Sequence, residues 1–133
     1  MSGTARIVGA AQPIPVSDLA ASEVFHAGTL GCHVKVRSDE HQFVTVRREG
    51  LMLGLKSSFG PEAVRITGEM MATQAWVDDL AALWDELGTG LQTLPEGRVR
   101  PPFRQPCGVR EFHVKDPDGF LMHFAEAAEA GIA

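Results

Sequence analysis

The five histidines are the residues of this chain with the widest range of chemistry, because an imidazole can transfer protons, donate hydrogen bonds or bind a metal ion. They are His26, His33, His41, His113 and His123. Their spacings match no recognised metal-binding motif, and the two cysteines, Cys32 and Cys107, form neither a CxxC pair nor a zinc-type spacing. Neither cysteine has an evident general base beside it in the sequence. For most of these histidines the pattern predicts an exposed or structural role.

The composition is that of an ordinary soluble domain. The chain has 133 residues, of which 44% are hydrophobic and 22% charged, so one domain over residues 1–133 is expected. A net charge of −5 provides no electrostatic footprint for nucleic acid. The first residues contain no apolar core behind a basic head, and no stretch approaches ~18 consecutive apolar residues, so we expect neither a signal peptide nor a membrane span. A cytoplasmic location with reduced thiols is the default expectation.

The stretch 108–126, GVREFHVKDPDGFLMHFAE, has the pattern of a β-hairpin. Pro117 presets its φ for a turn, and Gly119 can adopt the positive φ that completes one. The stretch 43–55, FVTVRREGLMLGL, has the same plan. Aligned at one constant spacing, it places Phe43 over Phe112, Gly50 over Gly119 and Gly54 over His123. The chain is therefore predicted to use one structural unit twice.

Two helix starts support this internal repeat. Ser17 or Asp18 can cap a helix that ends near Gly31, and Asp78 or Asp79 can cap a second helix that ends near Gly88. The second helix carries a clear apolar stripe, formed by Leu80, Leu83, Trp84 and Leu87. Each half is predicted as β-α-β-β-β. The fold class is thus α+β, with two tandem βαβββ modules, repeats 6–56 and 67–126 joined by a loop 57–66, and helices outside a curved, partly open sheet.

Strand alternation divides the side chains between two faces. One set is almost wholly apolar and is expected to pack against the helices: Val44, Val46, Leu51, Leu53, Leu55, Val77, Phe120, Met122 and Phe124. The opposite set mixes aromatic, polar and small residues, as a ligand cavity does. Its predicted ligand-binding members are Phe43, Met52, Gln74, Trp76, Arg110, Phe112, Leu121 and His123. His113 falls on the helix side, which indicates either a register slip by one residue or a position at the edge of the sheet.

Several of these positions allow a second interpretation. Trp76 could stack on a flat ligand or could pack in the core. Arg110 could bind a carboxylate or phosphate, or could form an ion pair with Glu111 or Asp118. The proline-rich stretch 92–107 carries three arginines and reads as a long loop with at most one short strand, either solvated or closing over the cavity as a lid. Those arginines are Arg98, Arg100 and Arg104.

Three short motifs resemble a known family. They are VSDL at 16–19, VDDL at 77–80, and GVREF at 108–112 followed by DPDG at 116–119. Together they resemble the glyoxalase, bleomycin-resistance protein and extradiol dioxygenase group, also called the vicinal oxygen chelate superfamily, over nearly the whole chain. The resemblance implies paired βαβββ modules around an open cavity, usually completed by the partner in a homodimer.

The resemblance also implies where a metal would bind. The family's four ligand positions fall on Ala11, Gly54, Ala72 and His123, and a shift by one residue gives Gln12 or Thr73. Of the residues at these four positions, only His123 has a side chain that can bind a metal. One imidazole alone cannot hold a catalytic metal ion. The expectation is therefore no metal and no cofactor. His123 would then act by a hydrogen bond to a ligand.

These points favour a binding protein over an enzyme. The function predicted from the sequence is a metal-free small-molecule-binding protein of the bleomycin-resistance type, which sequesters an aromatic or cationic ligand between its modules. The alternative is a metal-dependent glyoxalase-like lyase or dioxygenase, in which Gln12, His123 and another histidine hold a divalent metal. A role confined to protein–protein interaction has no positive feature behind it.

Overall fold

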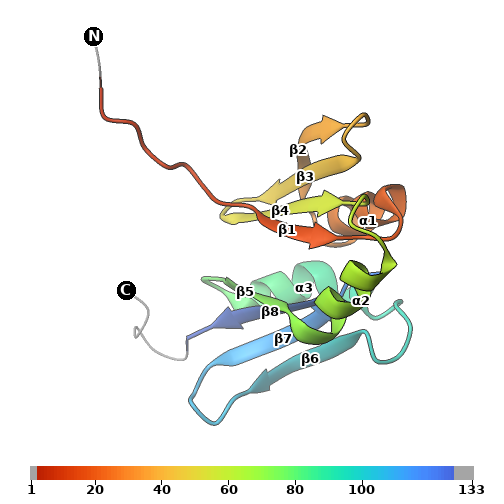
Figure 1. The fold of residues 1–133 in the computed structure, drawn as a ribbon. Coiled ribbons are helices and arrows are strands. Elements are labelled where there is room, and N and C mark those ends of the chain that lie inside the picture. The colour runs from red at the N-terminus through yellow and green to blue at the C-terminus, as the bar shows by residue number, and fades with distance from the viewer. Residues whose placement is uncertain (1–2, 128–133) are drawn as a thin grey trace.

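The computed structural model describes residues 3–127 and contains two four-stranded sheets with the same strand order. The N-terminal sheet has the order β1-β4-β3-β2 and the C-terminal sheet the order β5-β8-β7-β6 (Figure 1). The strands are β1 (Gln12–Pro15), β2 (His33–Ser38), β3 (Phe43–Arg48), β4 (Leu51–Lys56), β5 (Ala72–Trp76), β6 (Val99–Arg104), β7 (Arg110–Lys115) and β8 (Leu121–Glu126). The pairs β1–β4 and β5–β8 are parallel and all other pairs are antiparallel. The predicted α+β fold with two tandem modules is confirmed.

Each module carries one helix against its sheet. The first helix, α1 (Leu19–Val24), continues as a π-helix η1 (Phe25–Thr29), which the sequence did not predict. The second is α3 (Leu80–Leu91). Of the alternative caps, the side chains of Asp18 and Asp79 accept the N–H of Ala21 and Ala82 respectively, each at 3.0 Å. The helix α1 contacts β3 and β4, and α3 contacts β7 and β8, so the repeat extends to tertiary packing.

The predicted loop 57–66 is wrong, because a helix α2 (Pro61–Met70) joins the modules. Gly60, at φ 93°, is the N-cap residue, and Pro61 occupies the first turn, where its missing N–H costs nothing. The residues of α2 are exposed or half-buried, so the helix lacks the buried apolar stripe by which periodicity identifies helices. The strand expected from Glu69 accordingly begins later, at Ala72. None of the helices in residues 3–127 has the length and apolar character needed to cross a membrane.

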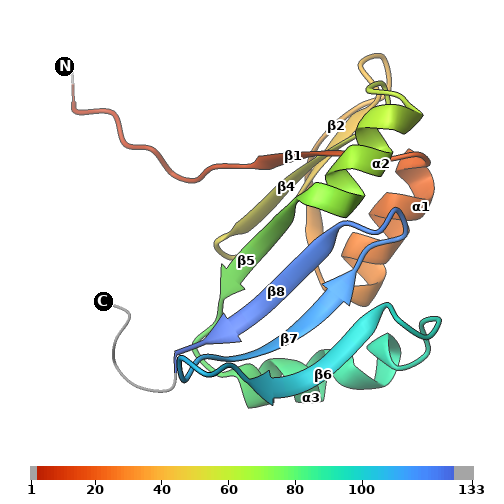
Figure 2. The ribbon, with the colours of Figure 1, turned by 60° about the horizontal axis from the view of Figure 1, so that its bottom comes forward.

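One hydrophobic core spans both modules. Most of the predicted helix-facing residues are buried and belong to one core with Leu80 and Leu91 of α3, while Leu51 and Val77 are half-buried against it. The buried ones include Val44, Val46, Leu53, Leu55, Met122 and Phe124. Each fully buried side chain of this kind contributes about 1.5–3 kcal/mol. The opposite faces of the two sheets are turned away from α1 and α3 (Figure 2). We call them the open faces.

The turn from Asp116 to Phe120 connects several elements. The Oδ1 atom of Asp116 accepts the N–H groups of Asp118 and Phe120, each at 2.9 Å, and Gly119 adopts a φ of +89°. The Asp118 carboxylate accepts the N–H and the hydroxyl of Ser17, just before α1, at 3.1 and 2.5 Å. A Cβ on Gly68 would lie 2.8 Å from the Asp118 carbonyl oxygen, so α2 also packs closely against this turn.

This turn sets a register that the constant-spacing alignment missed. In the first hairpin Thr45 pairs with Gly54, whereas in the second it is His113 that pairs with His123. In the second hairpin the Asp116 N–H donates to the Phe120 carbonyl at 2.9 Å, so residues 117–119 form the tip of the turn, one residue more than residues 49–50 of the first hairpin. Strand β7 is therefore shifted by one position relative to β3. A shift of one residue exchanges the two faces of a strand. The register slip that the sequence allowed for His113 is confirmed.

For this reason the sequence prediction placed Phe112 and Arg110 on the wrong face of the sheet. Phe112 is 0% exposed, stacks on Phe124 and contacts Trp84 of α3 with ring centroids 5.1 Å apart. Arg110 lies two residues from Phe112 on the same strand and therefore shares its helix-facing side. His113 occupies the open face instead.

Asp116 makes folding stability depend on pH. Burial raises the pKa of Asp116 from 3.8 to about 6, although the N–H groups of Phe120 and Asp118 act in the opposite direction. Because the folded-state pKa is the higher one, the stability gained from the bound proton is complete below about pH 4 and is lost as the pH rises through about 6. Asp116→Asn keeps an oxygen for the two N–H groups but does not ionise. Between about pH 4 and pH 7 the free energy of unfolding of the wild type should therefore fall relative to that of this variant. The fall should be about 1.4 kcal/mol for each unit by which the pKa of Asp116 is higher in the folded than in the unfolded state.

Urea unfolding of both proteins at several pH values measures this difference. Parallel stability profiles for wild type and Asp116→Asn would contradict the prediction.

Candidate functional site

The open faces are where side chains can meet a ligand. In β5 the open-face residues Ala72, Gln74 and Trp76 are exposed, while Thr73 and Ala75 between them are half-buried against the core. In the N-terminal sheet Phe43 and Met52 lie on the open face and are half-buried. The sequence prediction of these faces therefore holds for β3, β4 and β5.

The open face of the C-terminal sheet carries a cluster of three titratable side chains. His113 and His123 pair across β7 and β8, and their rings stack with centroids 4.0 Å apart and planes 11° apart. The Glu111 carboxylate forms an ion-pair contact with His113 Nε2 and lies 3.7 Å from His123 Nδ1. The three residues each offer one donor atom, and these three atoms lie within 4.8 Å of one another. We call Glu111, His113 and His123 the histidine–glutamate cluster.

The environment of the cluster favours a neutral His123. Burial lowers the pKa of His123, and the neighbouring His113 lowers it further, while Glu111 acts in the opposite direction. The Nε2 atom of His123 is buried and has no hydrogen-bond partner among residues 3–127. A neutral imidazole with an unpaired nitrogen can accept a hydrogen bond from a ligand or donate electrons to a metal ion.

Neighbouring side chains hold the cluster in place. Gln74 is the β5 residue directly beside His123, and the Phe103 ring meets His113 edge-on with centroids 5.1 Å apart. The Arg100 guanidinium lies 3.5 Å from the centre of the Phe103 ring, a cation–π contact. Arg100 and Arg104 thus belong to strand β6, while Arg98 donates to the Lys115 carbonyl. These contacts give Arg98 and Arg100 packing roles within the C-terminal sheet.

A pocket of about 750 Å³ lies between the modules. Apolar residues of α3 and the sheet form much of its lining, with Gln74 and Trp76 from β5. Arg48, from β3 of the other module, donates to both carboxylate oxygens of Glu86 in α3 at 2.7 Å and to the Leu30 carbonyl at 3.0 Å. Its lining also includes Leu83, Leu87, Phe124, Glu49, Asp78 and Asp79. An ion pair between the two modules therefore borders this pocket.

The predicted ligand residues fall into separate groups. Gln74 and Trp76 line the pocket, and Gln74 also adjoins His123. Leu121 lies near them on the open face, beside Ala72, whereas Phe43 and Met52 belong to the other sheet.

Sequence analysis missed Glu111, His113, Arg48 and Glu86. The alternating Glu-Phe-His of β7 would have revealed the first two had the longer turn been allowed for. The ion pair of Arg48 with Glu86 left no local signal, because the two residues come from different modules.

The other three histidines behave as the sequence predicted. His26 is buried, and its Nδ1 lies 2.8 Å from the Ser22 carbonyl oxygen. His33 and His41 are exposed. Burial raises the pKa of Cys32 to about 11, which makes its thiol a poor nucleophile.

Comparison with known proteins decides the family. Residues 6–124 match the family model described as the Glyoxalase/Bleomycin resistance protein/Dioxygenase superfamily. The chain belongs to this superfamily. No curated protein sequence matches it.

Solved structures of the superfamily share the fold. The bleomycin-binding protein of Streptomyces verticillus, in complex with copper(II)-bleomycin, is 25% identical with a TM-score of 0.71, and the match covers 95% of this chain and 100% of that one. The bleomycin resistance determinant of transposon Tn5 is 22% identical with a TM-score of 0.71, over 90% of this chain and 98% of that one. A lactoylglutathione lyase of Agrobacterium tumefaciens is 24% identical with a TM-score of 0.67, over 98% of this chain and 100% of that one.

The residues at the superfamily's expected metal positions do not fit a metal ion. Ala11, Gly54 and Ala72 offer no donor side chain. The strand neighbours of Gly54 and His123 are Pro13 and Gln74, so these positions bring together at most one imidazole and one amide. A catalytic zinc site takes three protein ligands. The donors that do lie next to His123 come from β7 instead.

The two tryptophans should differ in their effect on stability. Trp76 is 48% exposed on the open face, whereas Trp84 packs against Phe112 in the core. Trp76→Ala should lower the free energy of unfolding by less than about 1 kcal/mol. Trp84→Ala should lower it by roughly 3 kcal/mol, because it leaves a cavity. Urea unfolding of the two variants measures both values, and equal losses would show that Trp76 belongs to the core.

Proposed function

We propose that this protein binds an aromatic or cationic organic molecule and sequesters it without chemical change, as proteins of the bleomycin-resistance type do. The observation that carries the proposal is the pocket of about 750 Å³ between the modules. Its size is in the range of sites for drug-sized ligands, and it combines apolar walls with a few polar groups. The proposed sequestration requires no metal of the protein's own.

Trp76 gives the pocket an aromatic contact surface. Trp76 is 48% exposed and is one of the residues that line the pocket, as are the apolar residues Leu83, Leu87 and Phe124. An exposed indole beside an apolar wall suits a planar ring system, since aromatic pairs add about 0.5–1.5 kcal/mol beyond the burial of area.

Charge at the pocket favours a cationic ligand. Carboxylates line it from both modules, whereas Arg48 is already paired with Glu86. Glu86 is neutralised by that pairing, and the other carboxylates belong to Glu49, Asp78 and Asp79. Complementary potential steers a charged partner and raises its association rate. The chain's net charge of −5 acts in the same direction.

The similar structures support a ligand of this class. The S. verticillus protein binds copper(II)-bleomycin, and TnmS3 from Streptomyces sp. CB03234, 21% identical with a TM-score of 0.70 over 94% of this chain and 99% of that one, is an antibiotic-binding protein. Bleomycin is therefore a suitable first probe.

Titration with metal-free bleomycin in the presence of a chelator tests the proposal. We expect saturable binding of one molecule per chain by calorimetry, with a change in tryptophan fluorescence. Trp76→Ala should weaken binding roughly tenfold, because a stacking contact is worth about 1.4 kcal/mol. Met70→Ala removes an exposed apolar side chain of α2 that does not line the pocket and should leave the affinity unchanged. Absence of saturable binding, both for bleomycin and for a panel of smaller aromatic cations, would overturn the proposal.

The alternative function is a metal-dependent lyase or dioxygenase. The specific observation that favours it is the histidine–glutamate cluster, which supplies three donors where the superfamily's expected positions do not. Isomerisation of the hemithioacetal of methylglyoxal and glutathione to S-lactoylglutathione by metal-loaded protein, lost in His123→Ala, would favour the lyase over the binding protein. The similarity to the A. tumefaciens lyase supplies the choice of substrate.

The proposal includes a cytoplasmic homodimer. The open faces leave Trp76 exposed and Phe43 and Met52 half-buried, and an apolar surface of this kind is commonly covered by a partner. Sedimentation velocity at micromolar concentration should give about twice the chain mass of 14.3 kDa. A monomer under these conditions would contradict this part of the proposal.

A further inference from the structure

The carboxylate of Glu111 is an unusual group to find within a sheet. Its side chain is 4% exposed, and the hydrogen bonds and ion pairs of residues 3–127 give it no lysine or arginine partner. Its polar neighbours are the two imidazoles of His113 and His123. A buried carboxylate without a cation is costly unless it is paired or coordinates a metal ion. Positive charge beside this carboxylate can come from a proton on an imidazole or from a metal ion bound between the three side chains.

The backbone brings the three donors to one spot. Glu111 and His113 are two residues apart on β7, so both point to the open face, and His123 lies directly across from His113 on β8. One carboxylate oxygen, Glu111 Oε2, faces a ring nitrogen of each histidine. One donor atom from each of the three residues lies within 4.8 Å of the other two. Ligands of one metal ion at about 2.0–2.2 Å lie roughly 3–3.5 Å apart, a spacing that small side-chain rotations would reach here.

The donor types select the class of metal. Two imidazoles and one carboxylate suit the borderline divalent ions Zn²⁺, Ni²⁺ and Cu²⁺, whereas Mg²⁺ and Ca²⁺ prefer oxygen ligands alone. Around the donors, Gln74 adjoins His123 and the Phe103 ring packs edge-on against His113. Neighbours that fix the orientation of ligating rings are a regular part of metal sites.

We propose that Glu111, His113 and His123 bind one divalent transition-metal ion on the open face of the C-terminal sheet. This donor set differs from the superfamily's expected positions and shares only His123 with them. It is independent of the sequestration proposed above, which uses the pocket between the modules. Three protein ligands leave a coordination position free, so the bound ion would also accept a nitrogen or oxygen donor from a small molecule on that face.

Calorimetric titration with ZnCl₂ tests the site. The protein is tag-free, stripped of metal with a chelator and studied without any organic ligand. We expect one equivalent per chain, no binding of MgCl₂, and an increase in melting temperature on addition of zinc. His113→Ala and His123→Ala should each weaken zinc binding by at least about 100-fold. Removing a residue that only orients a metal ligand weakens metal binding by at most about that factor. Glu111→Gln keeps the shape of the side chain and should weaken binding in the same direction.

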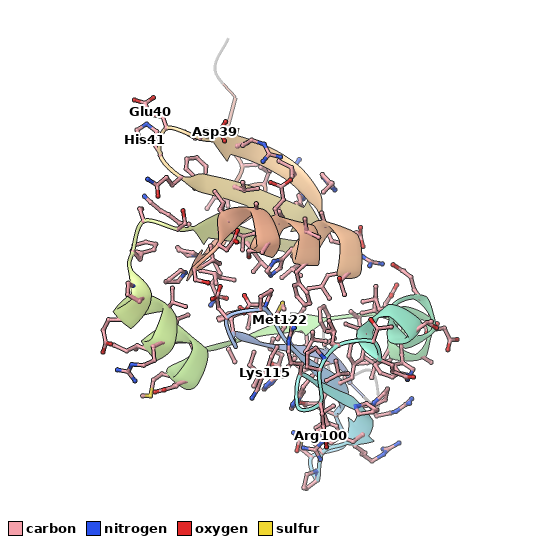
Figure 3. All side chains as sticks on the ribbon, turned by 90° about the vertical axis from the view of Figure 1, so that its right-hand side faces the viewer. Asp39, Glu40, His41, Arg100, Lys115 and Met122 are labelled. Carbon is pink, nitrogen blue, oxygen red and sulfur yellow. The ribbon has the colours of Figure 1, made fainter. Side chains whose placement is uncertain are left out.

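His41→Ala is the matched control. His41 is exposed at the turn between β2 and β3, and Figure 3 shows it at the opposite end of the view from Arg100 of β6. Its removal should leave zinc affinity unchanged. Unfolding midpoints measured without metal show whether each variant is folded. If a histidine variant does not fold, the zinc affinity of Glu111→Gln still tests the site.

Electron paramagnetic resonance of the Cu²⁺-loaded protein provides a readout that depends on the ligands themselves. Hyperfine coupling to two imidazole nitrogens is expected for the wild type, and coupling to one nitrogen for each histidine variant. The proposal is overturned if the wild type binds no zinc, or if the double variant His113→Ala/His123→Ala binds it as tightly as the wild type. Because bleomycin binding is measured in chelator, either result can fail without the other.

Discussion

The register between β7 and β8 is the constraint on which the rest of the C-terminal module depends. The Asp116 carboxylate holds it by accepting the N–H groups of Asp118 and Phe120, and Gly119 supplies the positive φ that the turn requires. A side chain in a strand can face only one of two sides, so a slip of one residue would carry His113 into the core and Phe112 out of it. The same turn that closes a hairpin thus decides which residues can meet a ligand.

The modules are joined by contacts of different kinds. Asp118 bonds to Ser17 ahead of α1, α2 packs against the same turn at Gly68, and Arg48 pairs with Glu86 across the pocket. Beneath these polar contacts runs one continuous apolar core. The core supplies most of the stability, whereas the polar contacts fix the relative position of the modules, because hydrogen bonds depend on direction and burial does not.

Two chemically different surfaces result from this arrangement. The pocket between the modules is apolar with an acidic border, while the open face of the C-terminal sheet carries the histidine–glutamate cluster. Gln74 belongs to both, since it lines the pocket and lies beside His123. A ligand large enough to extend past Gln74 would therefore contact both surfaces.

The sequence by itself determined what depends on local patterns. Strand alternation, the caps Asp18 and Asp79 and the repeated motifs were sufficient for two βαβββ modules and for most core residues, because periodicity and capping act over a few neighbouring positions. Gln74, Trp76 and His123 could be assigned to a ligand-facing surface on the same basis.

Only the tertiary structure decided the rest. The faces of Arg110, Phe112 and His113 depend on the length of one turn, and the helix α2 depends on packing that its weakly apolar sequence does not reveal. The ion pair at the pocket joins Arg48 and Glu86 from different modules. The histidine–glutamate cluster forms only when β7, with Glu111 and His113, pairs with β8, which carries His123. Such sites arise from contacts between residues distant in sequence or from exact register, and neither is fixed until the strands have paired.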